Sequence, residues 1–332
     1  MLDTKKRVVL VTGATGYIGS QVVYALQKLC GDTLHIRALV RPSSDLSVLS
    51  GLPVEIVKGD ILNPASLHEP FLSADAVFHC AGLVAYAKNH RRELHQTNVA
   101  GTANVVNACL QKGVNRLVLT SSVAALGVKD GGEPADEETT FNDWQRRIAY
   151  MESKRLAEME GERGIAEGLD VVMVNPGVVV GRSEGFPAFT NSATKAMERI
   201  YQGRIPLYPS GGISLVNIWD VARAHLEVWS KGKRGERYII VSENRSFGEL
   251  FAMIRELPGS RMRFAVSAVE SFYGIVGMGG ELYALLTGSR PYISLESMQL
   301  ARRKLYYSNR KSISKLGMSY RPVRDIVQSV VG

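Results

Sequence analysis

The sequence of 332 residues predicts an α/β fold, a doubly wound parallel sheet followed by a smaller, mostly helical C-terminal lobe. Short apolar runs alternate with stretches of helical periodicity from Val8 to Pro176, which is typical of a parallel sheet with helices on both faces. A glycine-rich turn follows the first apolar run directly. Beyond Pro176 the alternation decays and Gly and Pro become frequent, which indicates a second lobe.

Strands are expected at the apolar runs, because strands that are buried on both faces are continuously hydrophobic. In chain order the expected strands are Val8–Val11, Leu34–Val40, Val54–Val57, Ala76–Phe78, Arg116–Thr120 and Val171–Val174. The expected helices are Tyr17–Leu29, Pro64–Leu72, Thr97–Leu110, Gln145–Ala166, Asn191–Gln202 and Phe247–Arg255. Residues 1–186 are therefore expected to form the sheet domain, with segments near 213–245 returning to it. Residues 187–212 and 246–332 are expected to form the smaller lobe.

The composition is that of a globular protein. With 45% hydrophobic and 22% charged residues, it excludes disordered, coiled-coil and collagen-like chains. Its three cysteines are isolated, which excludes a disulfide-stapled scaffold. The segment from Phe264 to Gly288 is strongly apolar, but Glu270 and Glu281 interrupt it, so no membrane-spanning helix is predicted. No signal-peptide core precedes the first strand, and we expect a cytoplasmic protein.

The chain is basic, with 40 Lys and Arg against 32 Asp and Glu and a net charge of +8. Such an excess suits a phosphate-rich partner, but net charge alone does not identify one. Basic residues gather at Arg302–Lys304, Arg310–Lys311 and Lys315, with Tyr306 and Tyr307 between them. No nucleic-acid-binding module accompanies them, so we expect a solvated face and no nucleic-acid partner. The six histidines lack metal-ligand spacing, so no metal is expected.

The glycine-rich turn has the properties of a dinucleotide-phosphate site. It reads Thr12-Gly13-Ala14-Thr15-Gly16-Tyr17-Ile18-Gly19, with its three glycines spaced three apart. The early glycines let the backbone approach a pyrophosphate, the last lets the helix pack on the sheet, and the helix N-terminus faces the phosphate charge. We therefore predict an NAD(P)-binding Rossmann fold, with Gly13, Thr15, Gly16, Tyr17, Ile18 and Gly19 at the cofactor. A second glycine cluster, Gly274–Gly280, follows no strand and is expected to be loop.

The end of the second expected strand bears on which dinucleotide binds. An NAD site usually has Asp or Glu about 20 residues past the glycines, whereas this chain has Arg41 followed by Ser43 and Ser44. A guanidinium there can pair with a 2′-phosphate, which favours NADP(H). Arg41 as an ordinary loop residue is the alternative. Asp45 can also reach a ribose, so NAD(H) stays open.

A Tyr-x-x-x-Lys spacing places a phenol and an ammonium one helical turn apart on one face. The ammonium favours the phenolate and lowers the tyrosine pKa, so the phenol can exchange a proton with a carbonyl or alcohol oxygen. The spacing occurs three times, at Tyr24/Lys28, Tyr150/Lys154 and Tyr307/Lys311. Tyr150/Lys154 follows a strand that ends in the hydroxyl residues 120–122, and ligands bind at the carboxyl ends of parallel strands. We expect the other two pairs to lie on solvated faces.

Together these motifs resemble the extended short-chain dehydrogenase/reductases, over essentially the whole chain from Val8 to Arg324. The shared motifs are the glycine turn, Asp60, Ala81-Gly82, Ser122, Tyr150/Lys154 and Pro176-Gly177. Three further segments, Asn98–Thr102, Ser153–Glu158 and Tyr306–Arg324, resemble the dihydroflavonol-4-reductase-like branch of the NAD(P)-dependent epimerase/dehydratase group. That branch also contains cinnamoyl-CoA reductases, 3β-hydroxysteroid dehydrogenases and bacterial relatives named sugar epimerases.

The resemblance implies a role for each matching residue. Tyr150 would be the general acid and base, Lys154 would lower its pKa and hold the nicotinamide ribose, and Ser122 would hydrogen-bond the substrate oxygen. The residues implied at the cofactor, besides Tyr150 and Lys154, are Asp60, Ile61, Ala81, Gly82, Pro176, Gly177 and Val178. Asn98 would shape the helix near the site. Asp60 as a plain loop cap and Ser121 as a turn residue are the alternatives.

We therefore expect an enzyme, an NADP(H)-dependent oxidoreductase that reduces a ketone or aldehyde to an alcohol. Ser122 is followed by Val123-Ala124-Ala125 where nucleotide-sugar dehydratases carry an acidic pair, which disfavours dehydration. An NAD-dependent nucleotide-sugar epimerase and a 3β-hydroxysteroid dehydrogenase-like enzyme stay open as alternatives. A non-catalytic dinucleotide-binding sensor is a third class, and the intact set of Ser122, Tyr150 and Lys154 disfavours it.

Two expectations concern substrate and partner surfaces. Apolar residues of the second lobe would form a substrate wall, namely Phe264, Phe272, Tyr273, Met278, Leu282 and Tyr283. A lobe core or interface and a peripheral membrane contact stay open for the same segment. By analogy with relatives, the helices Thr97–Leu110 and Gln145–Ala166 would pair in a four-helix contact and make a homodimer.

Overall fold

A computed structural model describes residues 6–86, 88–183, 190–269, 273 and 294–331. Several predictions fall outside these residues: the glycine cluster Gly274–Gly280, the interrupting Glu270 and Glu281, the domain boundary at 186/187, and Phe272, Met278, Leu282 and Tyr283 of the expected apolar wall. Of that wall, Phe264 is 62% exposed and Tyr273 is buried. Nowhere in the described ranges does a helix combine the length and apolarity needed to cross a membrane.

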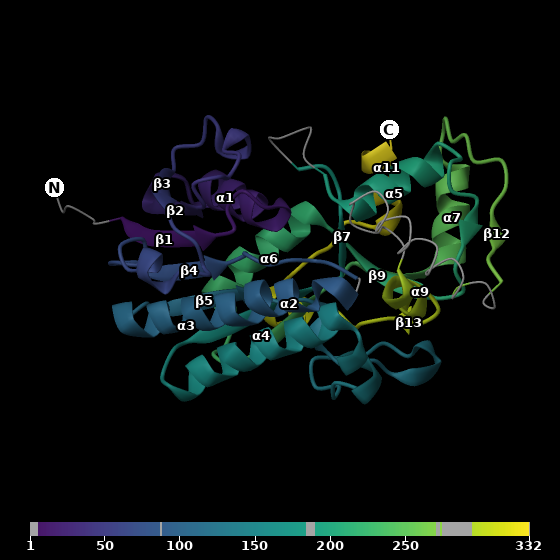
Figure 1. Cartoon of the computed structure of the whole chain (residues 1–332). Coiled ribbons are helices and arrows are strands. Elements are labelled where there is room, and N and C mark those ends of the chain that lie inside the picture. Colours follow the sequence, from purple (N-terminus) through teal and green to yellow (C-terminus); the bar gives the residue numbers. More distant parts are fainter. Residues whose placement is uncertain (1–5, 87, 184–189, 270–272, 274–293, 332) are drawn as a thin grey trace.

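A seven-stranded parallel sheet forms the centre of the protein, in the order β10-β6-β5-β4-β1-β2-β3 (Figure 1). Its strands are β1 (Arg7–Thr12), β2 (Leu34–Val40), β3 (Glu55–Lys58), β4 (Ala76–His79), β5 (Arg116–Thr120), β6 (Val171–Pro176) and β10 (Arg237–Ile240). The strand order reverses between β1 and β4, which is the signature of a doubly wound sheet. The predicted fold class is therefore confirmed.

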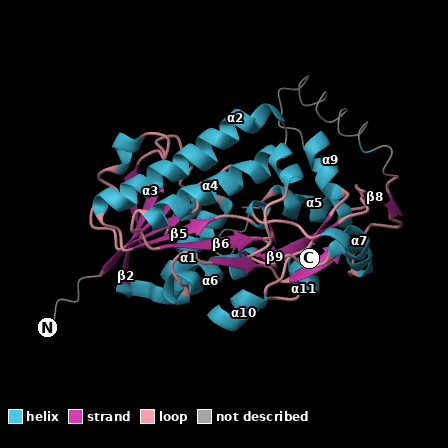
Figure 2. Ribbon diagram, turned by 90° about the horizontal axis from the view of Figure 1, so that it is seen from below, coloured by secondary structure: helices cyan, strands magenta, loops and turns pink. Residues whose placement is uncertain are grey.

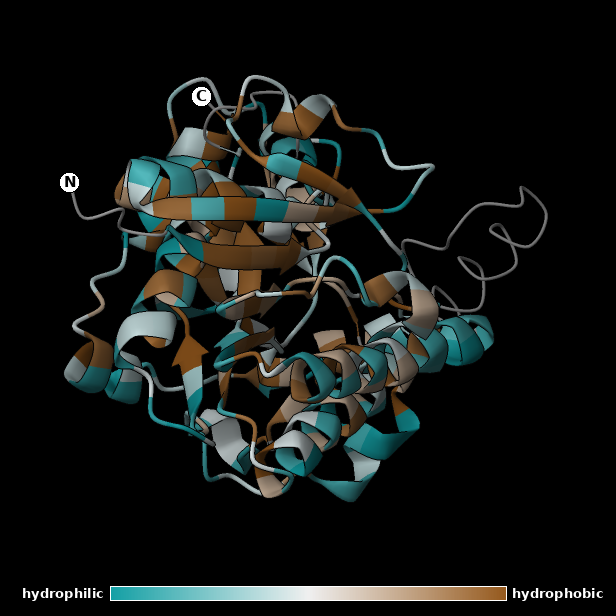
Figure 3. Ribbon diagram, turned by 90° about the vertical axis from the view of Figure 1, so that its left-hand side faces the viewer, coloured by the Kyte–Doolittle hydropathy of each residue, from teal (hydrophilic) through white to brown (hydrophobic). Residues whose placement is uncertain are grey.

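Helices cover both faces of this sheet, which is why its strands are continuously apolar. On one face α1 (Tyr17–Cys30) packs beside α6 (Ile218–Lys231), and on the other α3 (Gly101–Lys112) packs beside α4 (Ala149–Ala166) (Figure 2). Alternate residues of β1 point to opposite faces, so Val9 and Val11 join the core under α1 while Leu10 joins the core under α3. Figure 3 shows the same layering, with mostly brown strands between helices that turn teal surfaces outward.

A second, smaller lobe is built on another sheet, with the order β11-β9-β13 and with β7 paired to β9. Its strands are β7 (Val178–Val180), β9 (Gly212–Asn217), β11 (Glu243–Ser246) and β13 (Lys304–Leu305), besides the short pair β8 (Leu207–Tyr208) and β12 (Val266–Ser267). Its helices are α5 (Ser192–Tyr201), α7 (Phe247–Glu256), α9 (Leu295–Ala301) and α11 (Val323–Val331). Between β9 and β11 the chain returns to the main sheet as α6 and β10, and α10 (Arg310–Leu316) packs against both.

The predicted start of the helix Gln145–Ala166 is wrong, and the actual start determines where Tyr150 lies. The structure has a 3-10 helix, Asp143–Arg147, and then α4 from Ala149. Ile148 between them is extended, with φ −95° and ψ 108°, so the chain turns before α4 begins. Tyr150 consequently lies in the first turn of α4. Likewise, the expected helix Pro64–Leu72 is a single 3-10 turn, Pro64–Leu67.

Candidate active site

The residues predicted for the site follow strands of the main sheet and lie along its carboxyl edge, because all seven strands are parallel. Going along the sheet from β6 to β3, the edge carries Pro176–Val178, Ser122, Ala81-Gly82, the turn Gly13–Gly19, Arg41 and Asp60-Ile61. The reversal of strand order falls between Ala81 and the turn, where open α/β sheets bind ligands.

The glycine turn is shaped by two close approaches of backbone to backbone. Gly13 has φ +65°, and a Cβ on it would lie 2.6 Å from the Cα of Ala81. A Cβ on Gly19 would lie 2.1 Å from the carbonyl oxygen of Gly13, so the first turn of α1 packs directly on the loop. The Gly16 amide donates to Gly13 at 2.8 Å. This compact turn, which leads into a helix N-terminus, fits the diphosphate of a dinucleotide.

Tyr17 and Ile18, both predicted at the cofactor, have structural contacts of their own. The Tyr17 hydroxyl donates to the carbonyl of Gly181 at 2.7 Å, and burial raises the pKa of this phenol. Ile18 packs against the core under α1. Tyr17 therefore ties the turn to the segment that follows β7, whereas Thr15 and the exposed Gly16 form the tip of the turn.

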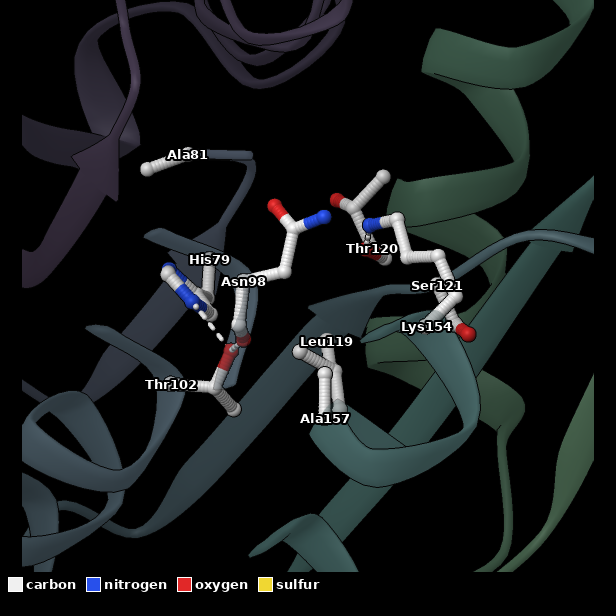
Figure 4. Close-up of a pocket in the computed structure, with 9 residues that line it drawn as sticks. All are labelled: His79, Ala81, Asn98, Thr102, Leu119, Thr120, Ser121, Lys154 and Ala157. Carbon is white, nitrogen blue, oxygen red and sulfur yellow. Dashed lines mark hydrogen bonds between the residues drawn. The ribbon is translucent and has the colours of Figure 1, made fainter. Parts of the chain in front are cut away.

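A chain of buried hydrogen bonds, which sequence reasoning missed, joins the ends of β1 and β4 to α3 (Figure 4). The Thr102 hydroxyl donates to the Asn98 carbonyl at 2.6 Å, so it accepts from Nε2 of His79 at 3.1 Å. Nδ1 of His79 then accepts from the Thr12 hydroxyl at 2.7 Å. Both ring nitrogens are thus satisfied by a neutral imidazole, and burial lowers the pKa of His79 to about 3.

Lys154 and Tyr150 are both buried, at 8% and 6% exposure, where α4 passes the end of β5. Lys154 Nζ donates to the carbonyl of Thr120 at 3.1 Å, and Figure 4 shows its side chain directed at that residue. A Cβ on Gly82 would lie 3.5 Å from the same Nζ, so the end of β4 also meets Lys154. The structure therefore brings Ala81, Gly82, Ser122, Tyr150 and Lys154 together.

Ser122 hydrogen-bonds Tyr150 and is held in place by the backbone two residues further along. Its Oγ accepts from the amide of Ala124 at 3.1 Å, which leaves its hydroxyl proton free to be donated. Burial raises the pKa of Tyr150 above its ordinary value, and the hydrogen bond with Ser122 opposes that rise. Desolvation of the phenol outweighs that hydrogen bond, and the expectation that Lys154 lowers the Tyr150 pKa stays a prediction.

Burial also acts on Lys154, whose pKa it lowers to about 8 against the opposing charge of Glu158. Glu158 is fully buried one turn further along α4, and its Oε1 accepts from Asn175 Nδ2 at 2.6 Å. The same Nδ2 donates to the backbone carbonyl of Ser122 at 3.1 Å. Arg237 of β10 pairs with the other carboxylate oxygen at 3.2 Å. This network holds Ser122 and α4 in register.

Asn98 fastens the loop after β4. Its side-chain amide donates to the Leu83 carbonyl at 3.0 Å, and its oxygen accepts from the Leu83 amide at 2.7 Å. It also donates to Ser153 Oγ at 3.0 Å, next to Lys154. The stretch His95–Ala100, which carries Asn98, is π-helical, a feature frequent at functional sites. The loop of Gly82 is thereby held against α4.

Arg41 and Asp60 lie toward the far end of the edge. Arg41 is exposed, and Ser44 Oγ accepts from its amide at 3.2 Å, which closes the loop behind β2. Arg37, by contrast, is engaged by Glu55 at 2.9 Å and by two backbone carbonyls. Asp60 Oδ1 accepts from the Leu62 amide at 2.9 Å, the contact of a loop cap, and Ile61 is buried beside Gly101.

Of the other two Tyr-x-x-x-Lys pairs, Lys28 is exposed, as expected, whereas Tyr307/Lys311 is packed, so the expectation of a solvated face is wrong for that pair. Lys28 lies over the rings of Tyr24 and Trp219, at 5.5 and 4.8 Å. Tyr307 is only 2% exposed, and Lys311 pairs with Glu236. No group of three or more potential metal-ligating side chains occurs within the part of the chain that is described.

Comparisons with known proteins agree with this geometry. Residues 9–241 match the family model of the NAD dependent epimerase/dehydratase family. A protein of Synechocystis sp. named "Putative dihydroflavonol 4-reductase" is 32% identical over 327 residues, which cover 97% of this chain and 92% of that protein. Cinnamoyl-CoA reductase 1 of Oryza sativa subsp. japonica is 32% identical over 267 residues, 76% of either chain.

Solved structures extend the likeness to the whole fold. The crystal structure of gox2253 superposes with a TM-score of 0.83 at 33% identity, covering 98% of this chain and 97% of that one. UDP-glucose 4-epimerase of Thermotoga maritima gives a TM-score of 0.76 at 19% identity, covering 98% and 97% of the two chains, a level of identity that speaks for the fold alone.

Proposed function

The chain belongs to the NAD-dependent epimerase/dehydratase family, and from that premise we propose that it reduces a ketone or aldehyde with NADPH. The family and its reductase-named relatives make it an NAD(P)-dependent oxidoreductase of the short-chain dehydrogenase/reductase type. The proposal of carbonyl reduction rests on one observation: Ser122, Tyr150 and Lys154 lie together at the end of β5. The names of the relatives support reduction over epimerisation.

Each of the three side chains has a separate role at the substrate carbonyl group. Ser122 donates a hydrogen bond to the substrate oxygen, and Tyr150 gives that oxygen the proton of its hydroxyl as general acid. Lys154, protonated below its pKa of about 8, stabilises the phenolate that the transfer leaves behind. NADPH, when bound, would supply the hydride for the carbonyl carbon. The residues around Gly13 and Gly82 fit such a cofactor, because both lack a side chain where the backbone closes on the edge.

The preference for NADPH is proposed from Arg41. Its guanidinium is exposed at the end of β2 and makes no hydrogen bond or ion pair with other described residues, so it is free to meet a 2′-phosphate. We expect Arg41→Ala to weaken NADPH binding about tenfold or more and to leave NADH binding within twofold, as measured by fluorescence titration. Equal losses for both cofactors would contradict this role.

The reductase is tested by screening carbonyl compounds for NADPH oxidation and then assaying Tyr150→Phe. We expect a loss of about 10²- to 10⁴-fold in kcat with unchanged NADPH affinity, because only the hydroxyl proton is removed. Tyr24→Phe is the matched control, since Tyr24 has the same spacing to a lysine but lies under α6. If the purified protein carries NAD that survives dialysis and no carbonyl compound is reduced, the epimerase takes the place of this proposal.

We also propose that the enzyme is a homodimer through α3 and α4. These helices lie side by side on one face (Figure 2), and Met159 of α4 is 48% exposed there. Light scattering is expected to give twice the chain mass, and Met159→Glu is expected to shift the protein toward monomer. A monomeric wild-type protein would refute the assignment.

A further inference from the structure

A hollow of about 890 Å³ lies beside the start of α4, and none of the predicted site residues lines it. Its walls come from the start of α2 (Arg91–Leu94), the 3-10 helix Asp143–Arg147 and α9 of the second lobe. Figure 1 labels α2 and α9. The side chains that line it are Arg91, Trp144, Arg146, Arg147, Leu295, Glu296, Gln299, Arg302 and Arg303. Five of these nine are arginines, and we call the hollow the arginine pocket.

The arginines outnumber the acids around them. Glu296 is the one acidic residue of the lining, and Arg91 and Arg146 have partners just outside it in Glu152 and Asp143. Arg147 is exposed, and its side chain makes no ion pair or hydrogen bond with the rest of the described protein. The pocket thus keeps a positive charge excess for a ligand.

An aromatic surface accompanies the charge. The guanidinium of Arg303 lies 3.9 Å from the centre of the Trp144 ring, a cation–π contact. This stacking holds the Arg303 side chain extended along the wall, so it meets an anion with less loss of side-chain freedom than a free arginine. Arg302 and Arg303 are exposed, as expected for the basic C-terminal segment, and both line the pocket.

Two of the elements that line the pocket are connected to Tyr150. Arg147 lies three residues before Tyr150 in the sequence. Glu152, the ion-pair partner of Arg91, lies two residues after Tyr150. In addition, the ring of Tyr86 contacts that of Tyr150 with centroids 5.2 Å apart, and Ser294, which caps α9, donates to the Tyr86 carbonyl. The 3-10 helix before α4 and helix α9 therefore link the arginine pocket to the surroundings of Tyr150.

We propose that the arginine pocket binds a phosphate or diphosphate group of the substrate. Guanidinium groups bind phosphate oxygens in bidentate geometry, and several arginines around one hollow match a group with several charged oxygens. The site is distinct from the dinucleotide turn, which lies across the edge at β1. The inference rests on the proposed function in one respect, that the anion belongs to the molecule that Tyr150 protonates.

The test measures binding of inorganic pyrophosphate to the full chain, by calorimetry, with NADPH saturating so that the dinucleotide site is filled. We expect saturable binding of one pyrophosphate per chain that weakens as salt is added. Arg147→Gln is expected to weaken it about tenfold or more, and Arg303→Gln likewise. Arg310→Gln, on α10, removes the same charge from an exposed position outside the pocket and is expected to leave the affinity within twofold.

The outcomes separate this inference from the proposed function. Absence of saturable binding, or equal losses in Arg147→Gln and Arg310→Gln, overturns the pocket, because the affinity would then reflect net charge alone. Succinate in place of pyrophosphate tests the chemistry, and equal or tighter binding of succinate overturns the assignment to phosphate. Pyrophosphate binding is measured without turnover. The result therefore tests the pocket independently of whether Tyr150→Phe abolishes reduction. Unchanged NADPH affinity in each variant shows that it has folded.

Discussion

Acid is expected to destabilise the protein through two buried neutral histidines, His79 and His225. Both are at most 1% exposed. His225 donates from Nδ1 to the carbonyl of Val221 at 2.8 Å, so its Nε2 accepts from the Thr120 hydroxyl at 2.8 Å. Like His79, it has no place for a second proton, and burial lowers its pKa to about 4.

The magnitude follows from the two pKa values. In the unfolded chain a histidine titrates near 6.5, whereas in the folded protein these two titrate near 3 and 4. The stability they contribute is therefore complete above pH 6.5 and is lost as the pH falls toward 4 and 3. Between pH 7.5 and 5.0 each histidine lowers the free energy of unfolding by about 2 kcal/mol and the pair by about 4 kcal/mol, a large part of the roughly 5–15 kcal/mol that holds a typical protein folded.

Urea unfolding at pH 7.5 and pH 5.0 measures this loss. The window ends at pH 5.0 because most carboxylates are still ionised there. We expect His225→Gln to be less stable at pH 7.5, since Gln packs differently, but to lose only about half as much free energy as the wild type between the two pH values. His68→Gln, whose side chain is 58% exposed, serves as the control and keeps the wild-type difference. A wild-type loss below about 1 kcal/mol, or the same loss in His225→Gln, would refute the reasoning.

Three further outcomes are expected. Gly13→Ala places a Cβ at φ +65° and 2.6 Å from Ala81, so NADPH should bind at least about tenfold more weakly by fluorescence titration; a Kd within twofold of wild type contradicts the role of the turn. The rate of carbonyl reduction should fall as the pH rises through about 8, where Lys154 loses its proton, and a rate that is flat up to pH 9.5 argues against a protonated lysine. Glu158→Gln removes the charge that raises the Lys154 pKa and should move this limb to lower pH, whereas Glu160→Gln, paired instead with Arg163, should not.

The sheet was predictable because its signal is local. Strands β2 and β5 begin and end where the apolar runs indicated, since a strand covered on both faces must be apolar throughout. The placement of Tyr150 and Lys154 was predictable for a similar reason, as the spacing and the preceding strand end both lie in one continuous segment. The start of α4 was misplaced because Ile148 leaves the helical conformation with neither Pro nor Gly to mark it.

The buried polar partners were not predictable from local pattern. Asn175 hydrogen-bonds Glu158, which is 17 positions away in the sequence, and Ser122, which is 53 positions away. Contacts at such separations leave no periodic pattern in the sequence. Tyr307 was assigned to a solvated face because basic residues surround it, yet β13 carries it onto β9 and into a buried cluster. An ionisable residue on the apolar side of a helix, such as Glu158 beside Ala157, is the signal that would have indicated a buried partner.

The return of α6 and β10 to the main sheet constrains how this protein can be divided or recombined. A fragment that stops after β6 lacks β10, the neighbour of β6, and lacks α6, which covers α1 and residues such as Val22. Such a fragment exposes a bare strand edge and an apolar face, both of which promote aggregation. Exchange of the second lobe with that of a relative needs junctions on either side of residues 218–240 as well as one after β6. The two lobes are therefore expected to be inherited and engineered as one unit, and changes of specificity to arise by substitution within the lobe rather than by its replacement.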